Sequence, residues 1–575
     1  MKVSENKYSL RIFTLAIVSI LLIGLIGVRL FIIQVFSHDY YSELADNQHQ
    51  LSTELTPERG EIFIQDRISQ IPSAVVVNVN RPRIVVNPQQ VESAPELTKI
   101  LSKALGLSEI EVLEKISDTN RKYVVIAKQV EEGIAESIKE MSLPGVYFEN
   151  EIHQNYPEGN LLSQVLGFVA FAENSRVGRY GLEQYFEEEL AGKTGFLKTE
   201  TGLSLGLTPQ DNDENTVVPA EDGVNLYLTI DRAIQFKVEE VLNRAVAAYG
   251  AKGGSVIVIN PKTGAILAMA NSPSFDPNNY NLVEDPAAFN NSSIQTAYEP
   301  GSVMKPITMA AAIEEEAVDP TTTFFDEGII ELENFTIRNS DSKKYGEVSM
   351  TQVLEESINT GIIFAEQKLG HDKFTEFMEN FGFGELTGIN LPFEAKGGID
   401  NLYRGGDLYP ATIAYGQGMT ATPLQIVNAF GVIANGGKLM KPYLVDEIAY
   451  SDGTRQKTKP EVVRQVISPR AASTVGAMIV SVVERGHGKR AGVPGYFIAG
   501  KTGTAQVAYE NKSGYDPSRN IGTFAGFGPI DDPAFAMIVK INEPHGVEFA
   551  ETTAAPAFGE IAQFILNYYQ IPASR

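Results

Sequence analysis

The sequence contains no cysteine and only six histidines. Without cysteine the chain cannot form a disulfide, use a thiolate nucleophile or bind zinc through thiolates. The histidines stand at positions 38, 49, 153, 371, 487 and 545, and no two of them have the spacing of a metal site. We therefore predict no metal site and no cofactor, and both a metallohydrolase and a Ser-His-Asp triad are disfavoured.

Basic residues are also scarce relative to acidic ones. The 575 residues include 47 Lys and Arg against 72 Asp and Glu, which gives a formal net charge of −25. Nucleic-acid binding through the phosphate backbone is disfavoured by this balance, and the simpler interpretation is an acidic, soluble surface. With 43% hydrophobic residues, a chain of this length is expected to hold at least two folded domains.

One segment near the N-terminus lacks charge altogether. Residues 12–28 would span about 26 Å as a helix, and the apolar character continues to residue 36 past the single Arg29. Lys2, Lys7 and Arg11 precede this run, which places the N-terminus in the cytoplasm. No small-residue cleavage site follows, so an uncleaved anchor is favoured over a signal peptide. We predict a cytoplasmic tail over 1–11, a single transmembrane anchor helix over 12–36 in the cytoplasmic membrane, and extracytoplasmic domains beyond it.

Three short motifs follow one another along the second half of the chain. They are Ser302-Val303-Met304-Lys305, Ser357-Ile358-Asn359 and Lys501-Thr502-Gly503-Thr504. Together they supply a serine nucleophile, a lysine one helical turn further on whose amine can fold back to the serine hydroxyl, a second hydroxyl, an amide and a cationic strand. This set is typical of acyl transfer through a serine ester, in which a lysine with a lowered pKa acts as the base.

Each motif has competitors elsewhere in the sequence. Ser340 with Lys343 also fits the first pattern, and strings similar to the third begin at Lys193, Lys262 and Lys512. Local context favours Ser302, which lies between a turn and an alanine-rich helical stretch. A helix-capping serine with a surface lysine is the simpler interpretation of an isolated S-x-x-K motif. The second motif, 55 residues downstream (357 minus 302), argues against that interpretation.

Around these motifs the chain resembles the class B penicillin-binding proteins, the monofunctional D,D-transpeptidases of peptidoglycan synthesis. Further segments that carry the likeness are Arg59-Gly60-Glu61-Ile62, Tyr180-Gly181-Leu182-Glu183, Leu228-Thr229-Ile230-Asp231 and Tyr415-Gly416-Gln417-Gly418. The division-type branch is the nearer one, through Phe381-Gly382-Phe383-Gly384 and Asn435-Gly436-Gly437-Lys438, although the elongation branch shares part of this pattern. The sequence departs from the family at Glu356, Ile358 and His487, which affects the rim of the site.

The resemblance implies a multidomain α+β chain. After the anchor it would have a mixed α/β pedestal, similar to the family's dimerisation domain, over 37–222. A transpeptidase domain of the penicillin-binding and serine beta-lactamase type, with an antiparallel sheet between helices, would follow over 223–575. The sequence favours a polar linker near 208–223 and amphipathic helices near 97–107 and 109–116. Strands are predicted at 255–259, 266–270, 497–507, 524–527 and 535–541, and a last helix at 553–569.

The implied activity is that of a serine-type D,D-transpeptidase with residual D-Ala-D-Ala carboxypeptidase activity. Ser302 would attack a stem peptide between its two terminal D-alanines, Lys305 would take the Ser302 proton, and a beta-lactam would acylate the same serine. The remaining expected roles are proton relay to the leaving group (Ser357), binding of the stem-peptide amide (Asn359), binding of the substrate strand and its carboxylate (Lys501, Thr502, Gly503, Thr504), and an oxyanion hole from the backbone N–H groups of Ser302 and Thr504.

Three alternatives stay open. A carboxypeptidase or serine beta-lactamase would share the motifs, but the anchor and the pedestal speak against both. A catalytically idle scaffold of the division machinery is disfavoured by the intact Ser302, and an elongation-type transpeptidase is the nearest rival to a septal enzyme. The expected partners are stem peptides ending in D-Ala-D-Ala, beta-lactams as inhibitors and, by resemblance, a polytopic membrane glycan polymerase with other division proteins.

Overall fold

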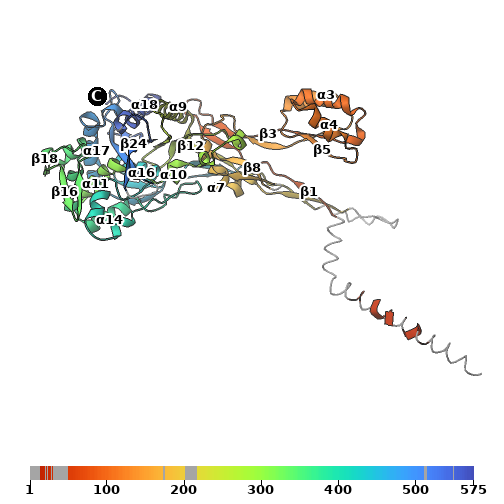
Figure 1. Ribbon diagram of the computed structural model, residues 1–575, viewed down its shortest axis with the longest axis horizontal. Coiled ribbons are helices and arrows are strands. Elements are labelled where there is room, and N and C mark those ends of the chain that lie inside the picture. Colours follow the sequence, from red (N-terminus) through yellow and green to blue (C-terminus); the bar gives the residue numbers. More distant parts are fainter. Residues whose placement is uncertain are drawn as a thin grey trace, which may run out of the picture. The chain divides into compact units, whose positions relative to one another are not determined.

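The computed structural model describes residues 50–172, 175–200, 216–509, 514–547 and 549–574, together with helical positions between 13 and 31 (Figure 1). The chain divides into two compact units. One consists of Met1–Glu58 and Gly192–Asp222, and the other consists of Arg59–Ala191 and Gly223–Arg575.

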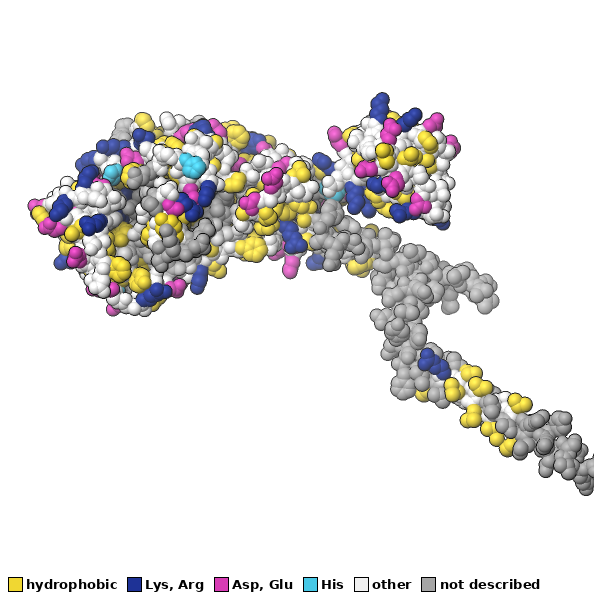
Figure 2. Space-filling view, in the orientation of Figure 1, with side chains coloured by type: hydrophobic (Ala, Val, Ile, Leu, Met, Phe, Trp, Pro, Cys, Tyr) yellow, Lys and Arg dark blue, Asp and Glu magenta, His cyan; other side chains and the backbone are white. Residues whose placement is uncertain are grey.

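The predicted tail and most of the predicted anchor lie outside the described residues. The positions that are described between 13 and 31 are helical, and their large apolar side chains, among them Phe13, Leu15 and Leu25, are exposed. These side chains appear in yellow along the described part of this helix in Figure 2. Within the described part of the chain, no helix is both long enough and apolar enough to cross a membrane. The anchor therefore stays a prediction.

The first unit contains a three-stranded antiparallel sheet in the order β1-β10-β11. Its strands are β1 (Gln50–Leu55), β10 (Gly195–Glu200) and β11 (Thr216–Val218). Gly195 begins β10 where a side chain would collide with backbone, because a Cβ there would lie 2.4 Å from the Val218 carbonyl oxygen. Part of the predicted linker, 208–215, lies outside the described residues.

The second unit contains a six-stranded sheet in the order β21-β20-β12-β2-β3-β7. Its strands are β2 (Ile62–Gln65), β3 (Ser73–Asn80), β7 (Ile152–Asn155), β12 (Asn225–Asp231), β20 (Val445–Ala449) and β21 (Arg455–Lys457). β12 pairs in parallel with β2 and antiparallel with β20. Strands from both sides of the predicted boundary at 222 therefore share one sheet.

A smaller lobe is inserted between β3 and β7. It has a sheet in the order β5-β4-β6, formed by β4 (Arg83–Val86), β5 (Val124–Ala127) and β6 (Val146–Glu149). Helices α3 (Ala94–Leu105), α4 (Glu109–Ser117) and α5 (Glu132–Glu140) accompany it. Leu97, Leu101, Val112 and Ile116 pack into one core cluster with the strands, so the two predicted amphipathic helices are confirmed.

The largest part of the second unit is built on a five-stranded antiparallel sheet in the order β14-β13-β25-β24-β23. Its strands are β13 (Gly253–Ile259), β14 (Ile266–Ser272), β23 (Ala499–Ala508), β24 (Tyr515–Gly528) and β25 (Phe535–Asn542). The predicted strands all fall within these ranges or overlap them, so the sheet is confirmed.

Alternate side chains of this sheet enter two different cores, as the twofold period of a strand requires. Val256 and Val258 pack with α9 (Arg232–Ala248) and α18 (Ala554–Tyr568). Ile257 and Ile259 point the other way, into the larger core that contains α11 (Lys305–Glu314), α16 (Pro423–Ala434) and α17 (Pro469–Glu484). The sheet therefore lies between two layers of helices, as the sequence predicts.

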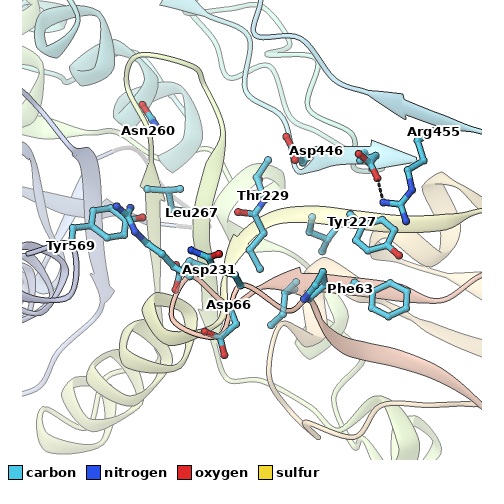
Figure 3. Close-up of a pocket in the computed structure, with 17 residues that line it drawn as sticks. Phe63, Asp66, Tyr227, Thr229, Asp231, Asn260, Leu267, Asp446, Arg455 and Tyr569 are labelled. Atoms are coloured by element: carbon cyan, nitrogen blue, oxygen red, sulfur yellow. Dashed lines mark hydrogen bonds and ion pairs between the residues drawn. The ribbon is translucent and has the colours of Figure 1, made fainter. Parts of the chain in front are cut away.

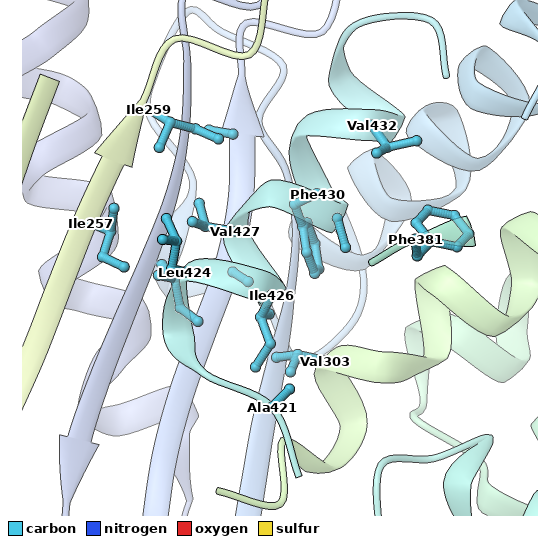
Figure 4. Close-up of a cluster of buried hydrophobic side chains, with 14 of the residues drawn as sticks. Ile257, Ile259, Val303, Phe381, Ala421, Leu424, Ile426, Val427, Phe430 and Val432 are labelled. Atoms are coloured by element: carbon cyan, nitrogen blue, oxygen red, sulfur yellow. The ribbon is translucent and has the colours of Figure 1, made fainter. Parts of the chain in front are cut away.

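Helix α16 is the centre of the larger core. Figure 4 shows Leu424 and Val427 of α16 beside Ile257 and Ile259 of β13, and Ile426 beside Val303. Thr422 caps this helix in a capping box with Gln425, which fixes where the helix starts. Because Val303 is fully buried in the same cluster, the turn that carries Ser302 is anchored in the core.

The remaining elements surround this framework. They are α6 (Ser163–Leu166), β8 (Phe168–Ala172), β9 (Ser175–Arg179), α7 (Gly181–Tyr185), α8 (Glu187–Ala191), α10 (Ser292–Gln295), β15 (Thr323–Asp326), β16 (Ile329–Leu332), β17 (Phe335–Arg338), β18 (Gly346–Ser349), α12 (Met350–Glu355), α13 (Asn359–Leu369), α14 (His371–Asn380), α15 (Leu408–Ile413), β19 (Lys438–Met440) and β22 (Val462–Gln465).

Candidate active site

Ser302 lies on a short 3₁₀ turn, η5 (Gly301–Met304), that leads directly into α11. Gly301 begins the turn with φ +62°, and its N–H donates to the carbonyl of Gly416 at 3.0 Å. Val303 and Met304 are fully buried, whereas Ser302 is half-buried. The turn thus holds the Ser302 side chain at the edge of the core, at the start of a helix as the sequence predicts.

The first residue of α11 is Lys305, whose side chain is fully buried. Its Nζ donates to Ser357 Oγ at 3.1 Å and to the Ser357 carbonyl. Burial lowers the pKa of Lys305 well below its usual range, and the nearby Lys501 charge lowers the pKa further. Both effects favour the neutral amine, which is the form that can act as a base.

The contact predicted between Lys305 and Ser302 is replaced by this contact with the second motif. Among the described residues, the Lys305 amine has Ser357 as its partner, and no hydrogen bond joins it to the Ser302 hydroxyl. Ser357 gives the Lys305 amine two hydrogen-bond acceptors, its Oγ and its carbonyl oxygen, whereas the Ser302 side chain would give only one. This geometry leaves the Ser302 hydroxyl available to an incoming carbonyl. The hydrogen bond between Lys305 and Ser302 is expected to form when substrate binds, because catalytic hydrogen bonds are often long until then.

Ser357 lies between α12 and α13 and is the point where the three motifs meet. Its Oγ accepts hydrogen bonds from Lys305 at 3.1 Å and from Lys501 at 3.0 Å, although Lys501 is 144 residues away in sequence. Its φ is +58°, a left-handed conformation that a residue with a side chain rarely adopts. Such strain persists where the surrounding structure enforces it, and it is concentrated at functional sites.

Asn359 is the first residue of α13 and is oriented by a neighbouring hairpin. Its Nδ2 donates to the Arg338 carbonyl at 2.9 Å, and its backbone N–H donates to Asn339 Oδ1 at 3.0 Å. Asn339 in turn donates to the buried carboxylate of Asp326 at 2.9 Å. Sequence reasoning missed Asp326 and Asn339, which hold the second motif in place through buried hydrogen bonds.

The third motif forms the start of β23, which is the outermost strand of its sheet. Lys501 is fully buried, and burial lowers its pKa to about 7 while Glu551 opposes the shift. Beyond its bond to Ser357, the Lys501 amine donates to the Thr502 carbonyl at 3.2 Å and to Thr502 Oγ1 at 3.4 Å. This places a titratable cation next to the serine of the second motif.

Gly503 allows β23 to approach the turn that carries Ser302. A Cβ on Gly503 would lie 2.9 Å from the Pro300 carbonyl oxygen and 3.0 Å from Val303 Cγ1. Thr504 Oγ1 accepts a hydrogen bond from the Ala550 N–H at 3.1 Å. The structure therefore brings all three predicted motifs together, with the first and third in van der Waals contact and the second bound to both.

Sequence reasoning missed a third buried lysine, which lies behind the site. Lys540 on β25 is 2% exposed, and its Nζ lies 4.6 Å from the centroid of the Tyr298 ring. Burial lowers the pKa of Lys540 to about 8. The Tyr298 hydroxyl and Thr523 Oγ1 are 3.1 Å apart, and Thr523 pairs in register with both Lys540 and Gly503. A single lysine in the apolar run 535–541 was the available signal in the sequence.

Two of the departures from the family pattern face each other at the rim. His487 Nε2 lies 3.9 Å from the Glu356 carboxylate, and His487 Nδ1 lies 3.4 Å from that of Glu551. All three side chains are substantially exposed, so the pairs contribute little to stability. Through these two departures, the rim of the site carries the imidazole of His487 close to the carboxylate of Glu356.

Comparison with known proteins identifies the domains. A family model described as "Penicillin binding protein transpeptidase domain" matches residues 254–563, and one described as "Penicillin-binding Protein dimerisation domain" matches residues 54–228. The chain is 33% identical over 568 residues to the Stage V sporulation protein D of Bacillus subtilis, covering 98% of this chain and 86% of the relative. It is 28% identical over 554 residues to the peptidoglycan D,D-transpeptidase FtsI of Escherichia coli, covering 94% and 88%.

A solved structure agrees with these matches. The peptidoglycan synthetase from Bifidobacterium adolescentis superposes with a TM-score of 0.71 at 26% identity, covering 92% of this chain and 98% of that one. The agreement extends over both matched domains. This chain therefore belongs to the penicillin-binding protein transpeptidase family, and the dimerisation domain in front of its transpeptidase domain makes it a class B member.

Proposed function

We propose that the protein is a membrane-anchored serine D,D-transpeptidase that crosslinks peptidoglycan stem peptides. The observation that carries this proposal is the shared hydrogen bonding of Lys305 and Lys501 to Ser357 Oγ, next to the turn of Ser302. A buried amine, a bridging hydroxyl and a nucleophile on a helix-leading turn are the parts that an acyl-enzyme mechanism needs. The anchor over 12–36 would hold the enzyme in the cytoplasmic membrane with its N-terminus inside.

Acylation starts when neutral Lys305 takes the proton of the Ser302 hydroxyl. Ser302 Oγ then attacks the carbonyl between the two terminal D-alanines, and the backbone N–H groups of Ser302 and Thr504 stabilise the oxyanion by about 3 kcal/mol per donor. When the C–N bond breaks, the leaving amine needs a proton. Ser357 is placed to pass the proton from Lys305 to that amine, because its hydroxyl contacts Lys305 directly. D-alanine leaves, and an ester on Ser302 remains.

A second stem peptide, which accepts the acyl group, completes the reaction. An amine of a neighbouring stem peptide gives its proton back along the same route and attacks the ester, which restores the Ser302 hydroxyl and forms the crosslink. If water attacks instead, the outcome is carboxypeptidase activity. A beta-lactam would form the same ester on Ser302 without an easily expelled leaving group, so the enzyme would stay acylated.

The donor strand is proposed to bind along β23. An outermost strand has backbone groups available to pair with an extended peptide. Lys501, Thr502 and Thr504 would receive the terminal carboxylate, Gly503 would allow close approach, and Asn359 would hold the amide of the stem peptide. Charge-assisted hydrogen bonds of this kind are the stronger ones, which fits recognition of a terminal carboxylate.

The cellular role is proposed to be septal wall synthesis, with a membrane glycan polymerase and other division proteins as partners. The relative in Escherichia coli named FtsI and the division-type sequence segments support this role. Wall synthesis during sporulation is the second candidate, because the Bacillus subtilis relative at 33% identity is a sporulation protein by name. Depletion separates these roles from elongation: filaments indicate division, rounded cells indicate elongation, and a defect confined to spores indicates sporulation.

Labelling with a fluorescent penicillin tests the catalytic assignment. We expect the full-length protein to be labelled and the Ser302→Ala variant to be unlabelled. Ser340→Ala is the matched control, because Ser340 begins the competing S-x-x-K motif and is exposed. Labelling that persists in Ser302→Ala refutes the nucleophile, and an unlabelled wild type supports the idle scaffold. Formation of crosslinked stem-peptide dimers from uncrosslinked peptidoglycan then separates a transpeptidase from a carboxypeptidase.

A further inference from the structure

Charged side chains outside the catalytic motifs commonly pair with a neighbour. A cavity of about 600 Å³ on the six-stranded sheet is an example (Figure 3). Arg455 pairs there with Glu447 at 2.6 Å, and Arg67 lies 4.2 Å from the Tyr569 ring centroid. These groups support the fold, and none of them is a buried charge without a partner. The lysines of the active site differ in this respect.

Lys501 is a buried amine without a carboxylate in contact. Its side chain is fully buried, and its amine donates to neutral oxygens of Ser357 and Thr502. Within the described ranges of the chain, this amine forms no ion pair. Burial disfavours the charged form, and Lys305 brings a second amine to the same hydroxyl. A negative charge further away is therefore needed if Lys501 is to stay protonated.

Glu551 is held beside the third motif by the backbone that carries it. It lies on a short 3₁₀ turn, η8 (Ala550–Thr552). The first N–H of this turn donates to Thr504 Oγ1 at 3.1 Å, and the Tyr249 hydroxyl donates to its last carbonyl at 2.6 Å. The two ends of the turn are thus hydrogen-bonded to different elements, β23 and the end of α9.

A glycine on the neighbouring strand makes room for this turn. Gly522 of β24 pairs with Thr504 of β23, and a Cβ on Gly522 would lie 2.8 Å from Thr553 Oγ1. The turn therefore packs directly on the two strands. Burial lowers the pKa of Lys501 to about 7, and from this position the negative charge of Glu551 opposes that shift.

His487, which follows the end of α17, lies between two carboxylates. Its Nδ1 is 3.4 Å from the carboxylate of Glu551, and its Nε2 is 3.9 Å from that of Glu356. Its backbone N–H donates to the Glu355 carbonyl at 3.4 Å, and a Cβ on Gly486 would lie 2.4 Å from the same oxygen. The backbone of His487 thus packs on α12, beside the second motif, while its imidazole reaches the carboxylate beside the third.

Other charged or titratable groups lie on the elements around His487 and the two lysines. They are Glu484 and Arg485 at the end of α17, Lys489 and Arg490 on η7 (Lys489–Ala491), Lys305 on α11, and Asp341 and Tyr345 before β18. Arg485 pairs with Glu355 at 2.9 Å. Asp341 acts on Lys305, whose pKa is lowered by burial and by the Lys501 charge. Glu551 is therefore the described carboxylate that acts on the charge of Lys501.

We propose that Glu551 is a positioning residue that keeps the Lys501 amine protonated for a substrate carboxylate, and that the charge of His487 opposes this effect. A nearby opposite charge favours the protonated amine, and a positive imidazole has the reverse effect. An imidazole loses its charge between about pH 5 and 8, so the opposition fades as pH rises. The rim thereby extends carboxylate binding to higher pH. This proposal rests on the function proposed above and concerns the regulation of the same site.

The test measures the second-order rate of acylation by a penicillin between pH 5 and 9 in the full-length protein. In Glu551→Gln, the fall of this rate with rising pH is expected to move down by about 0.5 pH unit or more, which lowers the rate at pH 8 about threefold. Glu551→Asp keeps the charge and is expected to fall near the pH of the wild type. A lower rate in Glu551→Gln without a shift would indicate a structural role only and would overturn the proposal.

Two variants of His487 separate charge from contact. His487→Arg is positive throughout this pH range, whereas His487→Gln is neutral, and both side chains can donate to the Glu551 carboxylate. The fall is expected at a lower pH in His487→Arg than in His487→Gln. Identical falls would refute the role of the His487 charge. Glu316→Gln and His545→Gln are the matched controls, because both residues are exposed, and neither is expected to shift the fall.

A second measurement reads the Lys501 amine without any acylation. The NMR resonance of its ε-carbon in lysine-labelled protein, assigned by its loss in Lys501→Arg, follows the protonation of this amine directly. The proposal predicts that the amine loses its proton at a lower pH in Glu551→Gln, and an unchanged pH would overturn it. A wild type that penicillin does not label would instead contradict the proposed function, and this resonance would still decide the role of Glu551.

Discussion

The amines of Lys305 and Lys501 both donate hydrogen bonds to the same atom, Ser357 Oγ, at 3.1 and 3.0 Å. Two ammonium groups so close would repel each other in a buried site, and burial lowers the pKa of both. The arrangement therefore favours one neutral amine and one charged amine. In the proposed mechanism Lys305 is the neutral partner that acts as the base, and Lys501 is the charged partner that receives the carboxylate.

The first prediction concerns the pH dependence of acylation. Lys501 must be protonated to receive a carboxylate, so kcat/KM for a carboxylate-bearing substrate is expected to fall as pH rises through about 7, the pKa of Lys501. The measurement is the second-order acylation rate between pH 5 and 9. Lys501→Arg keeps the charge at all these pH values and should lose this fall, with a lower overall rate. A fall that remains near pH 7 in Lys501→Arg would assign it to another group.

The second prediction uses the left-handed backbone of Ser357. Ser357→Ala and Ser357→Gly both remove the relay hydroxyl, so both are expected to slow acylation by about 10²- to 10⁴-fold. Only glycine relieves the φ of +58°, so Ser357→Gly is expected to be more stable than Ser357→Ala by about 1–2 kcal/mol. Urea unfolding of the two variants measures this difference. Equal stabilities would show that the backbone is unstrained there.

The third prediction concerns the contact between β23 and the turn of Ser302. Gly503→Ala places a methyl group 2.9 Å from the Pro300 carbonyl and displaces the strand from the turn. Misplacement of reacting groups by about 1 Å can slow a reaction about 10²-fold, and we expect a loss of this size in penicillin acylation with the fold retained. Gly133→Ala is the control, because nothing lies within 4 Å of a Cβ at Gly133. Wild-type acylation by Gly503→Ala would show that the strand and turn are not tightly fitted.

The fourth prediction concerns Lys540. Its pKa is about 8 in the folded protein, below the ordinary value of 10.5 for a lysine, so below pH 8 the buried charge costs up to about 3 kcal/mol. The unfolded state binds more protons than the folded state between pH 8 and 10.5, so this cost disappears as pH rises through that window. Lys540→Met is therefore expected to be more stable than the wild type at pH 7, with the gap narrowing by pH 9.5.

Urea unfolding at the two pH values measures this gap, and Lys262→Met, which changes a half-exposed lysine, is the control. A Lys540→Met variant that is less stable at pH 7 would show that the contact with the Tyr298 ring outweighs the cost of burial. In that case Lys540 would be a net stabilising residue.

The main elements of the catalytic part could be predicted from sequence because their signals are local. The apolar runs at 255–259 and 535–541 form β13 and β25, and the stretch after Ser302 forms α11. The first half of β24, from Tyr515, was missed because its residues are polar and its strand character comes from pairing with β23.

The contacts that define the site depend on tertiary structure and were harder to predict. The spacing of Ser302 and Lys305 correctly indicates a helix start, but only the packed structure shows that the Lys305 amine binds Ser357. Asn339, which directly follows β17, and Asp326, the last residue of β15, support Asn359, and neither belongs to a recognisable motif. Sequence pattern therefore pointed to the candidate reacting groups, whereas their supports come from distant segments with no recognisable pattern.

The six-stranded sheet has a mechanical consequence. β12 pairs with β2 on one side and with β20 on the other. A pull or twist applied to β2 is therefore transmitted through backbone hydrogen bonds to β12 and β20, which belong to the catalytic half. A cut at residue 222 would break this junction and leave two open strand edges prone to intermolecular pairing. Force applied to β2 would thus reach β20 of the catalytic half without passing through a hinge at that junction.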